Sequence, residues 1–351
     1  HAMSTLSYIK HLGWAAFVLL GAASCDSLIY DREGDCSVHY RLRFRYDMNL
    51  KFADAFAHEV ESVRLYAFDS EGKLVWQAAE QGEALAADGY SMLLDLAPGS
   101  YRLVAWCGLD GGDSFSLPDA ASACSPDDLH CRLSCISGTA AAGSSSPACS
   151  DSDLKPLFHG MMEVELPADD DGGEYTYEMS LTKNTNVFRV VLQHLSGEDL
   201  SAEDFEFGIE DCNGWLAYDN SPLSDRPVVY RPWAVYSGQA GVGSGRAITA
   251  VRVVVAEMTV NRLFMRDWTQ YRRPALVIRT AADGALVASV PIIDYALLVK
   301  GRHYAQMDDQ EYLDRADQYN MTFFLDSSNH WISTAIEVLS WRVVVNNSDL
   351  N

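Results

Sequence analysis

Hydrophobic and polar residues alternate along many stretches of this chain. The clearest case is residues 38–46, where apolar residues at the even positions alternate with a histidine and three arginines. Alternation with a period of two, in β-branched and aromatic residues, predicts a half-buried β-strand. We interpret Arg41, Arg43 and Arg45 as the solvated face of that strand.

The same pattern recurs to the end of the sequence. Turn residues between neighbouring segments predict hairpins around Gly72, at Asn213-Gly214 and at Asp283-Gly284. A helical pattern occurs only in residues 297–316. The sequence therefore predicts an all-β fold, with further strands at residues 60–68, 73–77, 90–96, 101–106, 157–166, 174–182, 186–194, 205–210, 215–218, 247–256, 259–264, 275–279, 285–290, 319–325 and 336–345.

The strands fall into two series, with a boundary near Lys183. We expect two tandem antiparallel β-sandwich domains, over residues 36–183 and 184–351. Periodicity fails in residues 108–153, which are rich in Gly, Ser, Ala, Asp and Cys. A loop this long is usually functional or disordered. We expect disorder, held in place by one or two disulfides.

The first residues have the order of a secretory signal. Lys10 and His11 precede an apolar run at residues 12–23 that is too short to span a bilayer, and small residues follow it. Cys25 comes directly after Ala22-Ala23-Ser24, as in a bacterial lipobox. We expect a lipoprotein signal peptide over residues 1–24, acylation of Cys25 and a polar tether over residues 25–35. The alternative is an ordinary secretion signal followed by an unmodified cysteine.

Charge and cysteine content narrow the candidate functions. The chain has 49 acidic and 26 basic residues and a formal charge of -23, which argues against nucleic acid as a partner. Export favours disulfides, and four of the eight cysteines crowd into the aperiodic segment. At least two of Cys124, Cys131, Cys135 and Cys149 are predicted to be disulfide-bonded. A zinc site that combines these cysteines with His130 is the alternative.

The sequence contains none of the common catalytic motifs. Gly-x-Ser-x-Gly, His-Glu-x-x-His and the phosphate-binding Gly-x4-Gly-Lys-Ser/Thr are all absent, and the histidines are scattered. Gly241 to Gly245 form a glycine-rich stretch without the third glycine at the required spacing and without the following helix of a dinucleotide site. We expect neither enzymatic activity nor a cofactor.

Several short motifs together resemble the FimB-like fimbrial anchor lipoproteins of Bacteroidales, which belong to type V fimbriae. The lipobox and the motifs occur in the same order and with similar spacing. The motifs are residues 43–49, 53–56, 65–69, 96–106, 157–160 and 310–315, followed by the terminal strand with Trp341.

This resemblance implies two transthyretin-like β-sandwich domains and attachment to the outer membrane through the acyl chains on Cys25. It also implies a place at the base of a polymeric fimbria, with fimbrial shaft subunits bound by β-strand pairing. Fimbrillins of this group assemble by strand exchange, so the last predicted strand is a candidate donor. The alternative is an ordinary core strand of the second domain. The candidate donor residues are Ile336, Val338, Leu339, Trp341, Val343 and Val345.

A surface glycan-binding lipoprotein is the alternative function from another class. Such a protein would also have β-sandwich domains and an acidic surface, but it would expose aromatic side chains as a platform for sugars. Trp76, Trp215, Trp233 and Trp268 are the candidates. We expect Trp76 and Trp215 to be core residues, because both lie in strand patterns.

Overall fold

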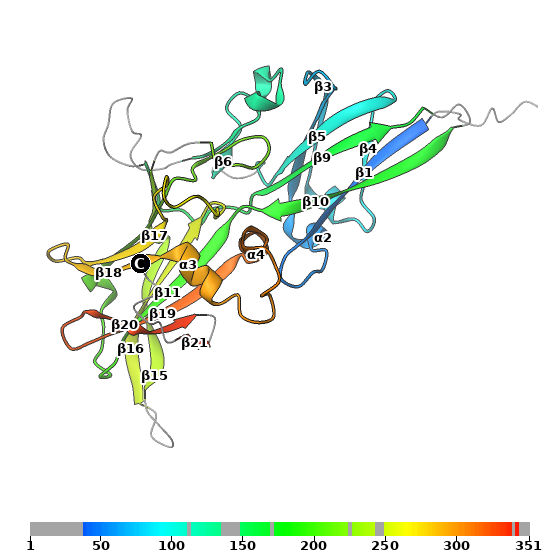
Figure 1. Cartoon of the computed structure of the whole chain (residues 1–351). Helices are drawn as coiled ribbons and strands as arrows, with labels where there is room; N and C mark the ends of the chain where they lie inside the picture. The colour runs from blue at the N-terminus through cyan, green and yellow to red at the C-terminus, as the bar shows by residue number, and fades with distance from the viewer. Residues whose placement is uncertain are drawn as a thin grey trace, which may run out of the picture.

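The computed structural model describes residues 38–110, 114–134, 148–168, 172–223, 227–242, 249–338 and 341–343, and most of them lie in β-strands. The chain is elongated, with one β-sandwich at each end (Figure 1). Within these residues the strands form four sheets, of seven, six, five and three strands. The all-β class predicted from the alternating pattern is therefore confirmed.

The first sandwich is formed by a seven-stranded sheet that folds over on itself. Its strand order is β3-β2-β5-β9-β10-β1-β4, and β9 and β10 pair through only two residue pairs, so the sheet divides there into two facing layers. Its elements are β1 (Val38–Met48), α2 (Phe56–Glu59), β2 (Ser62–Phe68), β3 (Leu74–Gln81), η1 (Gly82–Ala86), β4 (Met92–Leu94), β5 (Gly99–Cys107), β9 (Phe158–Leu166) and β10 (Gly173–Lys183).

The predicted alternation in the first strand is confirmed. In β1, Tyr40, Leu42, Phe44 and Tyr46 are buried, whereas the residues between them are exposed or half-buried. The buried residues pack with the inner faces of β2, β5, β9 and β10 in one core cluster. The strand thus inserts its apolar face between the two layers of the sandwich.

The expectation of a disordered loop at residues 108–153 is wrong for much of the segment. Residues 114–134 cover the outer face of β2 and β5, where Leu129, Cys131 and Leu133 join Phe68 and Trp106 in a buried cluster. The segment contains β6 (Phe115–Ser116), η2 (Ala120–Ser122), η3 (Pro126–Asp128), β7 (Cys131–Leu133) and β8 (Ala148–Ser150). These strands are too short to show a hydrophobic period.

The second sandwich packs a six-stranded sheet against a five-stranded sheet. The orders are β15-β16-β11-β19-β20-β21 and β18-β17-β12-β14-β8. The inner faces of both sheets share one core cluster. The strands are β11 (Asn186–His194), β12 (Phe205–Asp211), β13 (Trp215–Leu216), β14 (Val228–Tyr230), β15 (Ala234–Val242), β16 (Thr249–Val260), β17 (Ala275–Thr280), β18 (Leu286–Pro291), β19 (Gln318–Leu325), β20 (Trp331–Val338) and β21 (Trp341–Val343), with η4 (Ala202–Asp204) before β12.

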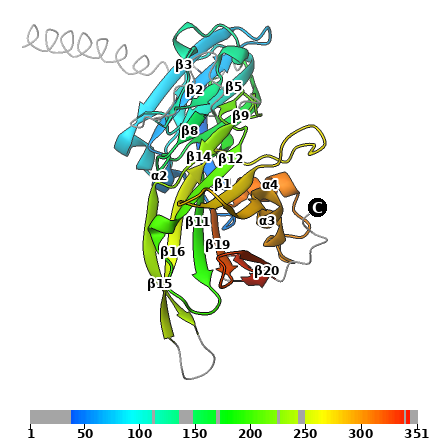
Figure 2. The same cartoon turned by 90° about the vertical axis from the view of Figure 1, so that its left-hand side faces the viewer.

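The predicted helical region is two short helices with a connection between them. α3 (Ile292–Leu298) begins before the predicted range, and α4 (Asp309–Arg315) ends within it. Asp308 is the N-cap of α4, because its carboxylate accepts hydrogen bonds from the backbone N–H groups of Gln310 and Glu311. Both helices lie on one side of the second sandwich (Figure 2).

Two of the three predicted hairpins are confirmed. β2 pairs with β3 around Gly72, and β17 pairs with β18 around Gly284; both glycines have positive φ. The hairpin at Asn213-Gly214 is wrong, because β12 pairs with β14 and β17, whereas β13 pairs with β7. The buried Asn213 side chain instead donates to the carbonyl oxygens of Asn261 and Arg262. A tertiary contact therefore replaces the local turn.

The predicted continuous strand over residues 336–345 is also wrong. β20 ends at Val338, and β21 runs antiparallel to it, with Ile336 opposite Val343 and Val338 opposite Trp341. β20 is held on its other side by β19. Of the candidate donor residues, Leu339 and Val345 lie outside the described residues. The chain thus reverses direction inside the segment predicted as a single strand.

Candidate functional site

The first strand is the feature that any proposal for assembly must explain. β1 is an interior strand: it runs parallel to β10 over nine residue pairs and antiparallel to β4 over three. It is also the first strand after the predicted tether. Its start lies at the end of the molecule remote from the second sandwich (Figure 1). The groove between β10 and β4 is therefore filled by the chain's own first strand.

The arginines of β1 form ion pairs with the neighbouring strand. Arg41 Nε lies 3.2 Å from Glu174 Oε1, and Arg45 Nη1 lies 3.3 Å from Glu178 Oε2. The hydrogen bond from Arg45 to Glu178 raises the pKa of the Arg45 guanidinium. Exposed pairs of this kind contribute little stability. Both ion pairs run diagonally across the ladder, because Arg41 lies opposite Thr176 and Arg45 lies opposite Ser180.

A lysine joins the two sandwiches at their junction. Lys183 is the last residue of β10, and its Nζ lies 2.9 Å from Glu59 Oε2 and 2.8 Å from Asp317 Oδ2. Burial lowers the pKa of Lys183, but the charges of Asp317 and Glu59 outweigh burial and raise it. The ammonium group thus stays charged at neutral pH and holds elements of both sandwiches together.

Arg315 of the second sandwich completes this junction, and Arg262 holds the helix α4 that carries Arg315. Arg315 Nη1 donates to the carbonyl oxygens of Asp47, at 3.0 Å, and Asn49, at 3.3 Å, just after the buried part of β1. Arg262 forms a two-pronged pair with Asp314, with both N···O distances 2.7 Å. The sequence analysis missed these residues, although Arg315 lies in one of the motifs that carry the family resemblance.

A buried histidine marks the second contact between the sandwiches. His159 of β9 donates from Nε2 to the carbonyl oxygen of Tyr218, at 2.7 Å, and its ring lies against the edge of Trp106. Burial lowers the pKa of His159 to about 4. The imidazole is therefore neutral at pH 7. A buried polar contact thus links β9 to the second sandwich.

Two edges of the six-stranded sheet are candidates for strand pairing. β15, at one edge, has nine residues without charge or proline and pairs with β16 in unbroken register. Val235 and Tyr236 are exposed on it. β21, at the other edge, pairs through only three residue pairs. An edge strand offers unpaired backbone groups to another chain, and charges or prolines normally prevent this.

The predicted cysteine sites are only partly within the described residues. Cys124 is exposed and Cys131 is buried in β7, and both are free thiols. Burial raises the pKa of the Cys131 thiol, which suits a structural rather than a reactive cysteine. Cys25, Cys135 and the Cys149 side chain lie outside the described part. A disulfide in this segment and the acylation of Cys25 therefore stay predictions.

The residues that the structure covers contain neither a metal-binding cluster nor a membrane-spanning helix. Among them, no cluster of three or more histidine, cysteine or acidic side chains could hold a metal ion. His130 instead stacks on Trp215, with ring centroids 5.3 Å apart. In the same part of the chain, no helix is long and apolar enough to cross a membrane.

The four tryptophans considered as a sugar platform have other contacts. Trp76 packs against the core of the first sandwich, and Trp268 packs against the core of the second. Trp215 contacts His130 and the Arg132 guanidinium. Trp233 is the most exposed of the four and donates from Nε1 to Thr259 Oγ1, at 3.2 Å. These tryptophans do not form a shared exposed platform.

Comparison with known proteins identifies relatives over nearly the whole chain. A family model described as fimbrillin-A associated anchor proteins Mfa1 and Mfa2 matches residues 32–347. A Bacteroides thetaiotaomicron protein named as a candidate adhesin is 35% identical, with a TM-score of 0.76 over 90% of this chain and 100% of that chain. A search of curated proteins finds no significant match.

Two further solved structures have the same fold. A Bacteroides thetaiotaomicron protein, named as a candidate polysaccharide-binding protein, is 28% identical, with a TM-score of 0.71 over 89% of this chain and all of that chain. The fimbrial anchor protein Mfa2 from Porphyromonas gingivalis is 16% identical, with a TM-score of 0.63 over 89% of this chain and all of that chain. At 16% identity, the likeness to this anchor concerns the fold alone.

Proposed function

This chain belongs to the family of fimbrillin-A associated anchor proteins, and we propose that it attaches a polymeric fimbria to the outer membrane through a lipid on Cys25. We further propose that it is the subunit at which assembly stops. The family is a structural one rather than an enzyme family, in agreement with the absence of catalytic motifs from the sequence.

The position of β1 is the observation that carries the proposal of termination. In strand exchange, a subunit loses its first strand and a strand of the next subunit fills the groove. Here the first strand lies between Cys25 and the rest of the chain, and it fills the groove between β10 and β4. Removal of β1 would separate the lipid from both sandwiches. An anchored subunit must therefore keep β1 and cannot accept a donor strand at this groove.

We propose that the strand offered to the shaft subunit is the C-terminal segment from Trp341 onward. β21 is attached to the sheet by three residue pairs, so its release breaks few backbone contacts. β20 pairs with β19 and would stay in the core. Backbone pairing supplies the affinity of such a contact, and alternate side chains fix its register. The donor thus begins five residues later than the alternating pattern predicts.

A Cys25→Ser variant tests the lipid anchor. Each buried acyl CH₂ contributes about 0.8 kcal/mol, so loss of the acyl chains should release the protein from the membrane fraction. Fimbriae should then detach from the cells into the medium. The anchor proposal fails if the variant remains in the detergent-extractable membrane fraction as fully as the parent protein does.

Truncation after Val338 tests the donor segment. The truncated chain keeps β20 and every strand of the first sandwich, so it should fold and remain in the membrane. Cells that carry it should lose their attached fimbriae. A truncated protein that is folded, membrane-bound and still retains fimbriae on the cell would exclude the donor role and leave the uncharged edge of β15 as the pairing site.

A further inference from the structure

We infer that the pairing between β1 and β10 is a mechanical joint that carries the tension between membrane and fimbria. The inference rests on the proposed function, because the direction of the load follows from an anchor before β1. Bearing tension is a mechanical function beyond attachment itself. The argument uses the direction of the two strands, their register and the contacts at both ends of the pair.

The two strands would be pulled at opposite ends of their shared ladder. β1 and β10 run parallel, with Val38 opposite Gly173 and Met48 opposite Thr182. The tether joins β1 at its start, whereas the second sandwich joins β10 at its end, since β11 begins at Asn186. Tension therefore pulls β1 toward its start and β10 toward its end. The strands are loaded along their length and are not peeled apart.

Loading in this direction engages the whole ladder at once. A force that peels two strands apart breaks their hydrogen bonds one pair after another. A force along the strands is shared by all nine residue pairs, since none can separate until the strands slide. The bonds of a parallel ladder are evenly spaced, so the load is distributed evenly. Rupture under force depends on the rate of unfolding, which such sharing lowers.

The side chains of β1 oppose any sliding. A shift by one residue would turn Tyr40, Leu42 and Phe44 to the solvent face and would bring the arginines into the core. A shift by two residues would restore the alternation but would separate the Tyr40 hydroxyl from the Pro167 carbonyl oxygen, to which it donates. A shift by either one or two residues is therefore unfavourable, and the joint has no low-energy shifted register.

Both ends of the pair are also fixed to their surroundings. The Tyr46 backbone N–H donates to Asp54 Oδ1, at 2.9 Å, near the end of β1. At the end of β10, Lys183 contacts Glu59 and Asp317, and Asp317 directly precedes β19 of the second sandwich. The force that enters at Lys183 is thus distributed to elements of both sandwiches and does not act on the backbone of β10 alone.

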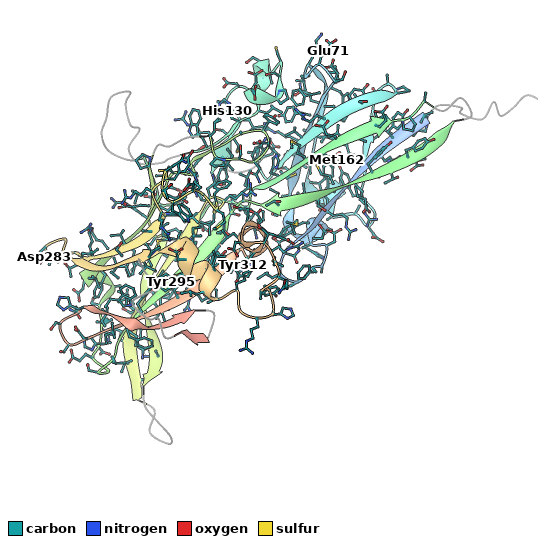
Figure 3. The ribbon with its side chains drawn as sticks, viewed as in Figure 1. Glu71, His130, Met162, Asp283, Tyr295 and Tyr312 are labelled. Atoms are coloured by element: carbon teal, nitrogen blue, oxygen red, sulfur yellow. The ribbon has the colours of Figure 1, made fainter. Side chains whose placement is uncertain are left out.

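Single-molecule pulling on the whole chain tests the joint. In the shear geometry, one handle is placed ahead of Val38 and the other at Ala282, beside Asp283 at the far tip of the second sandwich (Figure 3). In the peeling geometry, the second handle moves to Ala168, before the start of β10. We expect the rupture force of the first sandwich to be several times higher in shear. Equal forces in the two geometries would overturn the inference.

The increase in extended chain length at each rupture event identifies which sandwich has unfolded. β7 and β8 pair with β13 and β14 of the second sandwich, so rupture of the first sandwich frees the chain from Val38 to Asp110, which is 110 - 38 + 1 = 73 residues or roughly 250 Å. Rupture of the second sandwich frees the chain from Ser114 to Ala282, which is 282 - 114 + 1 = 169 residues or roughly 570 Å. The comparison between geometries uses only events with the shorter release, because both pairs of handles enclose residues 38–110.

Two matched core variants separate the joint from the general stability of the sandwich. Leu42 in β1 and Leu65 in β2 are both fully buried in the same core cluster. Leu42→Ala and Leu65→Ala should have similar urea midpoints, but only Leu42→Ala should lower the rupture force in shear markedly. Equal losses of force would mean that the core as a whole bears the load. The wild-type comparison of geometries decides the inference if either variant fails to fold.

These measurements use purified protein and do not depend on the lipid. A failed anchor appears as membrane retention of the Cys25→Ser variant, whereas a failed joint appears as equal rupture forces in the two geometries. The two failures are therefore distinguishable.

Discussion

Replacing Lys183 by methionine tests whether the junction depends on the ion pairs that this lysine forms. The ammonium group lies within 3 Å of two carboxylates, Glu59 and Asp317, from elements on either side of the junction. Methionine keeps an unbranched apolar chain of similar length, so packing changes little. The two carboxylates would then face each other across the junction without their shared counter-charge.

The expected loss follows from the burial of the three groups. Removing one partner of a fully buried ion pair costs about 3–5 kcal/mol. Here the lysine side chain is 14% exposed, but the carboxylates of Glu59 and Asp317 are 37% and 31% exposed, so water screens them. We therefore expect about half of that loss, roughly 2 kcal/mol. Because the pKa of Lys183 is raised, its contribution is complete at neutral pH and disappears only in alkali, as the pH rises through the raised value.

Urea unfolding at pH 7, followed by tryptophan fluorescence, measures this loss. A matched control is Lys155→Met at an exposed lysine, which should unfold at the wild-type urea midpoint. Combining Lys183→Met with Glu59→Gln and Asp317→Asn removes the uncompensated charges and should recover most of the loss. The reasoning is refuted if Lys183→Met leaves the urea midpoint unchanged, or if the triple variant is less stable than the single one.

Two further predictions concern the seam beside β9. The neutral His159 has a pKa of about 4 in the folded state against 6.5 unfolded, so the unfolded state binds the extra proton between these values and stability falls as the pH drops. We expect protonation of His159 in the unfolded state to lower the free energy of unfolding by about 2 kcal/mol between pH 8 and pH 5. His159→Gln should flatten this pH dependence in urea titrations, whereas His58→Gln, at an exposed histidine, should not. Gly108 has φ +88°, and an added Cβ would lie 2.1 Å from the Pro156 carbonyl oxygen, so Gly108→Ala should cost about 3 kcal/mol or more. Gly284→Ala, with φ +71° and open space, should cost only about 1 kcal/mol in the same urea unfolding assay, and equal losses would contradict the steric argument.

The sequence predicts the elements whose burial is set by their own pattern. The prediction of β1 is correct because five apolar residues with a period of two need to be buried on one face, whichever strands cover that face. The hairpins at Gly72 and Gly284 are correct because positive φ at the turn is a local demand. The signal at Asn213-Gly214 is equally strong. It fails because β13 gains more from pairing with β7 than from folding back on β12, and local sequence contains no information about that partner.

The same limit explains the errors in the aperiodic segment and at the C-terminus. β7 has three residues, and Leu129, Cys131 and Leu133 are buried only because β2 and β5 present an apolar outer face that needs covering. In the last strand, the alternating pattern continues across the reversal between β20 and β21, so the pattern cannot reveal a change of direction. The junction was missed for a related reason. Lys183 and Arg315 are ordinary charged residues in sequence, and they become a site only through elements more than 100 residues away.

The segment over residues 114–134 also bears on how the two sandwiches move. Only Asn184 and Thr185 separate β10 from β11, which alone would permit bending. The segment removes that freedom. Trp106 of the first sandwich donates to the Leu129 carbonyl oxygen, at 3.2 Å, and Leu133 donates from its backbone N–H to the Gly214 carbonyl oxygen of the second, at 2.8 Å. One core cluster accordingly contains residues of β5, of this segment and of both sheets of the second sandwich. Bending would therefore expose apolar surface on both sides of the junction. The two sandwiches thus keep a fixed relative orientation when the chain is pulled at its ends. Under that condition the ladder between β1 and β10 is loaded in shear.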